Sequence, residues 1–163
     1  MGSKAGNILV KALGRIPMFK DLHPLHMKRF LRICVLKVYK PGFQLCVNDM
    51  PSDSMFILLT GELVVVTGDG TQVATIFPVK TVGEMGVITG ERRSATVEVS
   101  RLSHIFVITK RTFDFYLSED AGVRATIYKN IIDDLSFKLA NSNKRIIDYQ
   151  KELTSGSRGM SAT

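Results

Sequence analysis

The chain lacks most of the patterns that identify secreted domains and membrane-spanning proteins. Its two cysteines, Cys34 and Cys46, are too few for a disulfide framework or a cysteine-based metal site. No apolar run is long enough to cross a bilayer, and the first residues do not resemble a secretory signal. We therefore expect a cytoplasmic protein with no membrane span, in which both cysteines are small buried apolar side chains on neighbouring strands.

Catalytic motifs are also missing. The sequence has no Walker phosphate loop, no Gly-x-Gly-x-x-Gly between a strand and a helix, no His-Glu-x-x-His and no Cys-x-x-Cys. His23 and His26 flank an expected helix start, and His104 lies in an expected strand without acidic residues nearby in sequence. Because a general base needs a partner that tunes its pKa, we expect neither catalysis nor a bound metal.

The excess of positive charge does not by itself identify a partner. The 163 residues include 22 Lys and Arg against 15 Asp and Glu, a formal net charge of +7. No basic run exceeds two residues, whereas a nucleic-acid-binding module usually gathers its charge on one face and adds aromatic side chains or a recognition helix. We expect the excess to favour anions in general, including a nucleotide, and predict no direct binding to nucleic acid.

What the sequence does contain is the pattern of one small domain, 1–153, followed by a flexible, Ser- and Gly-rich tail at 154–163. Hydrophobic residues make up 45% of the chain, enough for a core. Residues 4–32 are predicted to be helical with interruptions at Gly14, Pro17 and Pro24, and residues 111–153 are predicted to be helical throughout. Between them, residues 33–110 divide into β-rich runs at 34–39, 43–47, 54–60, 62–67, 71–77, 95–99 and 103–109.

Residues 82–97 have the composition of an anion-binding segment. Three glycines, Gly83, Gly86 and Gly90, allow positive φ and bring backbone N–H groups close to an anion. The planar guanidinium of Arg93 matches phosphate oxygens, whereas Glu84 repels a phosphate and suits a sugar hydroxyl. The spacing favours a site for a phosphate and a neighbouring sugar over a glycine-rich hairpin with a solvated arginine pair.

This segment closely resembles the phosphate-binding cassette of the cyclic nucleotide-binding domain family, in which Gly-Glu and a short apolar helix precede Arg-(Ala/Ser/Thr)-Ala-(Thr/Ser). The matching residues are Gly83, Glu84, Met85, Gly86, Val87, Ile88, Arg93, Ser94, Ala95 and Thr96. The resemblance implies that Glu84 contacts the ribose 2′-hydroxyl and that Arg93, by its register with Ser94, contacts the cyclic phosphate. A short helix at 85–89 would supply backbone amides.

The resemblance extends over roughly residues 12–150, with two departures from the family pattern. Phe43 replaces an acidic residue after Pro41-Gly42, and residues 79–81 replace a Gly-Asp-aromatic triplet. The implied fold is α+β and mainly β: an eight-stranded antiparallel jelly-roll β-barrel with N-terminal helices and a long C-terminal helix.

The C-terminal helix carries a second pattern. Apolar residues recur at 135, 139, 146, 149 and 153, with Ser142 between them, at spacings of 4, 3, 4, 3 and 4. This is the seam of a two-stranded coiled coil, and it predicts a homodimer; the alternative is a single helix packed on the barrel. By resemblance to the catabolite activators of the family, Ser142 and Asn143 would reach the purine, one from each protomer, although both also suit a solvated helix surface. The alternative is that Lys144 and Arg145 stack on or cap the base. The expected apolar walls of the purine site are Val65, Val73, Ala74, Val82 and Met85.

Together these patterns predict a regulatory domain that binds a cyclic nucleotide between the barrel and the C-terminal helix. We expect cAMP as the ligand. The alternative is cGMP, because the Ser94 hydroxyl could serve either nucleotide. Other interpretations are a nucleotide-free dimerisation or interaction domain of the same fold, or the sensory part of a larger enzyme, channel or transcription factor with a fused or separate effector. A catabolite-activator type of transcription factor would carry a helix-turn-helix after the long helix, and this sequence ends before one.

Overall fold

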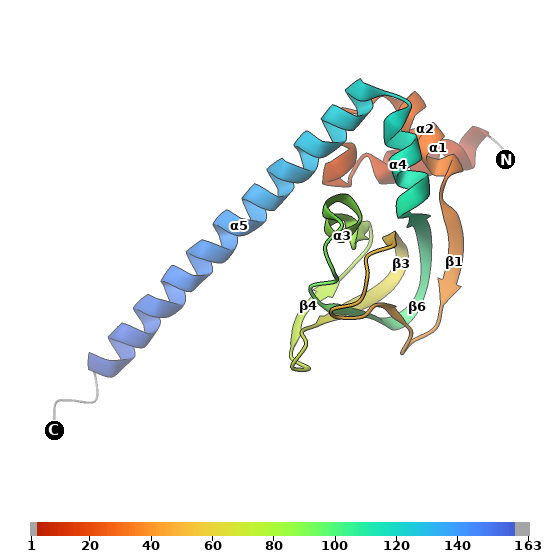
Figure 1. The fold of residues 1–163 in the computed structure, drawn as a ribbon. Helices are drawn as coiled ribbons and strands as arrows, with labels where there is room; N and C mark the ends of the chain where they lie inside the picture. The colour runs from red at the N-terminus through yellow and green to blue at the C-terminus, as the bar shows by residue number, and fades with distance from the viewer. Residues whose placement is uncertain (1–2, 159–163) are drawn as a thin grey trace.

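Helices lie at both ends of the chain and strands lie between them (Figure 1). The computed structural model describes residues 3–158. The elements, in order, are α1 (Ser3–Leu13), the 3-10 helix η1 (Pro17–Phe19), α2 (Pro24–Arg32), β1 (Val35–Tyr39), β2 (Gln44–Cys46), β3 (Ser54–Val66), β4 (Gln72–Ile76), β5 (Lys80–Val82), α3 (Glu84–Thr89), β6 (Thr96–Thr109), α4 (Lys110–Ser118) and α5 (Ala121–Arg158). This order confirms the expected helical entry, β-rich middle and helical exit.

The strands form one antiparallel sheet. Its main path is β1-β6-β3-β4, with β2 also paired to β6 and β5 paired to β3. The two long central strands β3 and β6 place Ile57 opposite Phe106 and Val65 opposite Val97. The sheet curls around these two strands in Figure 1, which brings β4 and the loop before β6 toward the same end.

The described residues contain six strands, and the sheet remains open at β1 and β4, so it differs from the expected eight-stranded barrel. Strand β3 combines the predicted runs 54–60 and 62–67, and β6 combines 95–99 and 103–109. Strand pairing continues through Gly61, where φ is +99° and the register shifts, so the chain bends without leaving the sheet. The short β5 was not predicted, because three residues are too few for a visible alternation.

The alternation of side chains along β3 divides the core in two. Met55 and Ile57 face a cluster built with the helices, whereas Phe56 and Leu58 face a cluster inside the curled sheet. In the first cluster Phe30 of α2 makes edge-to-face contacts with Phe19, at a centroid distance of 4.7 Å, and with Tyr116 of α4, at 5.4 Å. These contacts fix the terminal helices on one face of the sheet.

Helix α5 begins against the domain and then leaves it (Figure 1). The Asp120 carboxylate accepts hydrogen bonds from the amides of Gly122 and Val123, which separates α4 from α5 within the predicted helical region. Side chains 136–154 are all exposed. The helix continues to Arg158, beyond the predicted end at 153, and residues 159–163 of the predicted tail lie outside the described part.

Both cysteines are free thiols, and neither is part of a disulfide. Cys46 is buried in β2, and Cys34 is half-buried just before β1. Cys46 therefore fits the expectation of a small buried side chain on a strand, whereas Cys34 does not, because β1 begins one residue later, at Val35. Strands β1 and β2 both pair with β6.

Candidate functional site: the cassette between β5 and β6

The cassette is a short helix held between two left-handed glycines. Gly83 precedes α3 and Gly90 ends it, and both have φ of +78°. Such a backbone conformation strongly favours glycine, so the two residues set where the helix begins and ends. The predicted helix at 85–89 is confirmed, with Glu84 as an additional first residue. The first amides of a helix have no partner within it, so they can meet an anion.

Arg93 lies inside the cassette. Its side chain is 8% exposed, and its Nη1 donates to the Gly83 carbonyl oxygen at 3.1 Å. Nη2 donates to the carbonyl oxygen of Ser54 in β3. Arg92, by contrast, is exposed and lies 3.8 Å from Asp49 in an ion pair. A guanidinium has five N–H donors, so Arg93 retains donors beyond these two bonds.

The loop 48–54 packs against Arg93 and α3, and the sequence analysis did not assign it to the site. The amide of Asp49 donates to the Arg93 carbonyl at 2.8 Å, and the amide of Arg93 donates to the Met50 carbonyl at 2.9 Å. The Ser52 hydroxyl is buried without a hydrogen-bond partner among the described residues. It faces Gly86 of α3, where a Cβ would approach it to 2.0 Å. The loop therefore fixes Arg93 and limits residue 86 to glycine.

Three charged groups of this region act on one buried thiol. Burial raises the pKa of Cys46, Arg93 lowers it, and Asp53 and Glu84 raise it. The Arg93 guanidinium and the two carboxylates therefore lie near one end of the curled sheet. One cation with two acidic neighbours suits a ligand that carries both an anion and hydroxyl groups.

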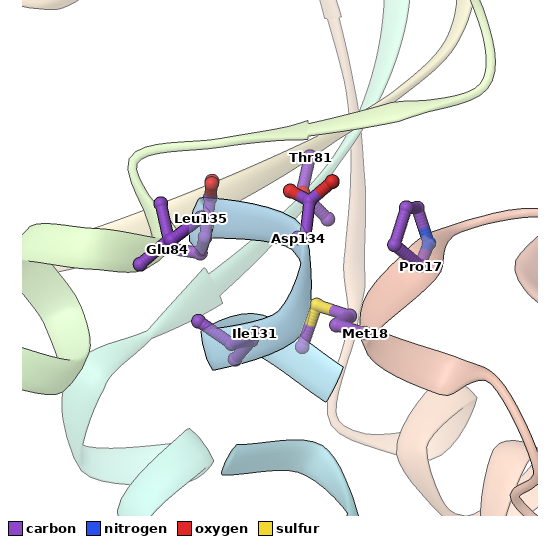
Figure 2. Close-up of a pocket in the computed structure, with 7 residues that line it drawn as sticks. All are labelled: Pro17, Met18, Thr81, Glu84, Ile131, Asp134 and Leu135. Atoms are coloured by element: carbon purple, nitrogen blue, oxygen red, sulfur yellow. The ribbon is translucent and has the colours of Figure 1, made fainter. Parts of the chain in front are cut away.

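Helix α5 covers the cassette at Glu84, as Figure 2 shows. A cavity of about 10 Å³ separates the helix from the cassette, which is space for about one water molecule. Its lining consists of Pro17, Met18, Thr81, Glu84, Ile131, Asp134 and Leu135. Glu84, the first residue of α3, thus lies beside η1 and the first half of α5.

A profile of the cyclic nucleotide-binding domain family matches residues 36–120. This match spans β1 to the end of α4 and includes the whole cassette. The chain belongs to the cyclic nucleotide-binding domain family. The domain of this family is regulatory and not catalytic, and it occurs in kinase regulatory subunits, channels and transcription regulators.

Individual relatives agree with this assignment. A cyclic nucleotide-gated cation channel protein of Drosophila melanogaster is 30% identical over 122 residues, which cover 71% of this chain and 18% of the channel protein. A cyclic nucleotide-binding domain from Methylobacillus flagellatus has the same fold with a TM-score of 0.76 at 20% identity, covering 90% of this chain and 84% of that one. The regulatory domain of Toxoplasma gondii PKA with cAMP has a TM-score of 0.65 at 18% identity, covering 71% and 46%. The chain spans about a fifth of the length of the curated relatives it matches.

In the cyclic nucleotide-binding domain, two of the predicted wall residues, Val82 and Val65, pack in the same cluster inside the curled sheet. Val82 is buried and lies opposite Phe56 of β3, and Val65 lies opposite Ala74 on the β3–β4 ladder. The remaining cassette and wall residues differ in exposure: Gly86 and Val87 are buried, Ala95 is half-buried, and Val73, Met85 and Ser94 are exposed.

Two predicted residues lie elsewhere in this arrangement. Ser142 and Asn143 are exposed on the second half of α5, which runs away from the cassette (Figure 1). Their predicted contact with a purine therefore requires α5 to move or a second protomer to approach, and it stays a prediction.

The structure adds Lys110, which the sequence did not reveal. Its Nζ donates to the Val87 carbonyl in α3 at 2.6 Å and lies 3.2 Å from the Asp114 carboxylate in α4. The amide of Lys110 also donates to the Asp53 carbonyl at 2.7 Å. Lys110 thus links the cassette helix to α4, which leads directly into α5. No local sequence signal marks it, because the contact joins residues that are 23 positions apart.

Other kinds of site find no support in the described residues. Across residues 3–158, no group of three or more His, Cys, Asp and Glu side chains is placed to hold a metal ion. Within the same range, no helix is both long enough and apolar enough to span a bilayer.

Proposed function

We propose that this domain is a cyclic nucleotide sensor whose cassette binds cAMP. The observation that carries the proposal is the buried Arg93 guanidinium, which lies against the left-handed Gly83 at the start of α3. A buried guanidinium is costly unless charged or polar partners satisfy it, and here its partners are two neutral carbonyl oxygens. A cyclic phosphate would supply the missing negative charge.

Each part of the ligand has a candidate partner. Arg93 and the amides at the start of α3 would bind the phosphate oxygens, and the Glu84 carboxylate would accept a hydrogen bond from the ribose 2′-hydroxyl. The purine would lie against the apolar residues of β3 and β4, where Val65 and Val73 are candidates, and Met85 of α3 would face it. Ser142 or Asn143 would then cap the base from α5.

The preference for cAMP over cGMP rests on similarity. The regulatory domain of Toxoplasma gondii PKA, which shares this fold, is described with cAMP. The exposed Ser94 hydroxyl could serve the phosphate of either ligand or the amino group of guanine. We therefore propose cAMP and treat cGMP as the alternative.

Signal transmission would use the contacts that join the cassette to the C-terminal helices. A ligand that draws α3 inward would change the contact of Glu84 with α5 and the bond from Lys110 to Val87. The domain would exist in two conformations that differ in the position of α5. The ligand would shift the population toward the conformation that it binds more tightly. We further propose that α5 forms a homodimer through its exposed seam, and that the effector is fused or separate in the cytoplasm.

Calorimetric titration with cAMP and then cGMP tests the proposal. The intact chain should bind at least one of them with micromolar or tighter affinity. Arg93→Ala should weaken binding at least about 30-fold, because the loss of a charged hydrogen-bonded partner costs about 2–5 kcal/mol. Arg92→Ala is the matched control, since Arg92 is exposed and should leave the affinity within about threefold.

Thermal unfolding of each variant shows whether it is folded at the temperature of the titration. If Arg93→Ala does not fold, Arg93→Lys replaces it, since lysine keeps the charge and loses the planar fork. Failure of the intact chain to bind either nucleotide would contradict the sensor and leave dimerisation through α5 as the function with most support.

A further inference from the structure

The first forty residues carry the entire positive excess of the chain. Residues 1–40 contain nine basic residues and a single acidic residue, Asp21, whereas the whole chain has a net charge of +7. The basic residues are Lys4, Lys11, Arg15, Lys20, Lys28, Arg29, Arg32, Lys37 and Lys40. Residues 41–163 are therefore nearly neutral, and the charge belongs to α1, α2, β1 and the turns that adjoin them.

These basic side chains are open to solvent. The eight from Lys11 to Lys40 are all exposed. Every ion pair found among the described residues joins side chains beyond residue 40, so none of the eight is neutralised by a direct partner there. The hydrogen bond from the Val123 amide is the main cause that lowers the pKa of Asp120, just before α5, and the charges of His26 and Arg29 lower it further, so Asp120 marks one border of the region.

Helix α2 presents this charge on one face together with an apolar residue. Leu25, Lys28, Arg29 and Arg32 follow helical spacing and are exposed, while Met27 and Phe30 on the opposite side are buried. Helix α1 packs beside α2, and its Ile8 and Lys11 are exposed as well. Figure 1 shows both helices at the end of the molecule opposite the free end of α5.

Strand β1 continues the same character. It follows α2 directly and is an edge strand whose Val35, Leu36, Lys37 and Val38 are all exposed. Successive side chains of a strand point to opposite sides of the sheet, and Leu36 shares the side of Phe106, which packs with the helices, whereas Lys37 shares the side of Ile105. We define the basic face as Ile8, Lys11, Leu25, Lys28, Arg29, Arg32 and Leu36. On this face exposed aliphatic side chains lie next to cations over α1, α2 and the start of β1.

We propose that the basic face binds the surface of an anionic lipid bilayer. Lysine and arginine side chains near such a surface are attracted by its negative potential, and neighbouring aliphatic side chains enter the headgroup boundary. A nucleic acid would instead favour aromatic side chains for base stacking. Among residues 6–40, Phe19 and Phe30 are buried and Tyr39 is half-buried, so His23 carries the only exposed aromatic ring of this range, too little for a row of stacked bases.

The proposal does not depend on nucleotide binding, because the basic face includes no cassette residue. The proposed contact is docking on the membrane surface and not insertion, since no helix among the described residues is long and apolar enough to cross a bilayer. Failure of one proposal therefore leaves the other intact.

The chain offers a matched pair of variants for the test. Lys28-Arg29 on α2 and Lys144-Arg145 on α5 are the same dipeptide, and all four side chains are exposed on helices. The variants K28E/R29E and K144E/R145E therefore have identical composition and net charge, and differ only in where the charge is removed. Co-sedimentation with phosphatidylcholine vesicles, with and without phosphatidylserine, measures binding of the full chain and both variants.

We expect the intact chain to bind only the vesicles that contain phosphatidylserine, and less tightly as salt is raised. K28E/R29E should lower the partition coefficient at least about 30-fold, since two surface cations are lost and two anions are added, whereas K144E/R145E should change it less than about threefold. Leu25→Ser should also weaken binding, and its effect should persist at high salt because it removes an apolar contact.

Three outcomes would overturn the proposal. Absence of binding to anionic vesicles would do so, as would an equal loss in both charge variants, which would mean that only net charge matters. Tighter binding to duplex DNA or to polyglutamate than to the vesicles, measured in the same buffer, would assign the basic face to a different class of partner.

Discussion

Nη1 of Arg93 lies 3.1 Å from the carbonyl oxygen of Gly83, so one hydrogen bond joins the two ends of the cassette. The contact is close because residue 83 has no side chain: a Cβ there would lie 2.3 Å from the same nitrogen. The left-handed turn and the buried guanidinium are therefore two parts of one arrangement, in which Gly83 both begins α3 and makes room for Arg93.

This relationship predicts that Gly83→Ala destabilises the domain and weakens nucleotide binding together. The substitution introduces a non-glycine residue at φ of +78° and forces the Arg93 guanidinium to move. Gly90→Ala is the control, because Gly90 has the same φ but nothing within 4 Å of the added Cβ. Urea unfolding should show a loss of about 1–2 kcal/mol for Gly90→Ala and a larger loss for Gly83→Ala. Equal losses of unfolding free energy in the two variants would mean that the Arg93 side chain moves away from the added methyl group without cost.

A second prediction concerns the attachment of α5. Buried Asn130 donates through Nδ2 to the carbonyl oxygens of Met18, at 3.2 Å, and Lys20, at 2.6 Å. Asn130→Ala leaves both carbonyls without these partners and should lower the free energy of unfolding by about 1–3 kcal/mol. It should also speed amide hydrogen exchange at the start of α5 and in η1.

The exposed Asn141 on the same helix provides the control for that substitution. Asn141→Ala changes helix propensity by the same amount and removes no buried hydrogen bond, so its effect should stay within about 0.5 kcal/mol. If both variants unfold alike, Asn130 does not hold α5 against η1.

The sequence predicted the local features of the fold better than the long-range ones. Gly14 follows the end of α1, and Pro17 and Pro24 begin η1 and α2, at the predicted interruptions. The helix after Gly83 formed because the turn and the apolar run are adjacent in sequence. The number of strands was missed because pairing across β3 and β6 continues through Gly61, which reads as a break in the sequence alone. Whether a bend interrupts a strand depends on the strand that pairs with it, and β6 is distant in sequence from β3.

The same distinction applies to the site. Gly83, Glu84 and Arg93 could be chosen from one short segment, and the structure places them together. Lys110 and Ser52 could not, because their contacts with α3 come from other elements. The position of Ser142 and Asn143 depends on the direction that α5 takes after Leu135, and no pattern within the helix determines that direction.

A third prediction concerns alkaline pH. Burial raises the pKa of Cys34 from 9.0 to about 12. Above pH 9.0 the thiol of the unfolded chain therefore loses its proton while the folded thiol keeps it, so folding stability falls as pH rises toward about 12. Burial likewise raises the pKa of Tyr116 from 10.0 to about 12, so its contribution begins at higher pH. Cys34→Ala should reduce the decline just above pH 9.0 in urea unfolding, where the raised pKa of Cys46 also contributes, and Tyr116→Phe should reduce only the later part. An unchanged decline in Cys34→Ala would show that this thiol is not protected by the fold.

The last prediction tests the proposed dimer through α5. Leu139 belongs to the heptad seam and is 63% exposed, and Phe137 is 66% exposed but lies outside the seam. Two residues apart on a helix, their side chains point to nearly opposite sides, so one dimer interface cannot bury both. Leu139→Glu should therefore convert a dimer to a monomer in sedimentation equilibrium, and Phe137→Glu should leave the dimer intact. A dimer lost only in Phe137→Glu would place the interface on the other side of α5, and a monomeric parent chain would show that the seam serves another contact.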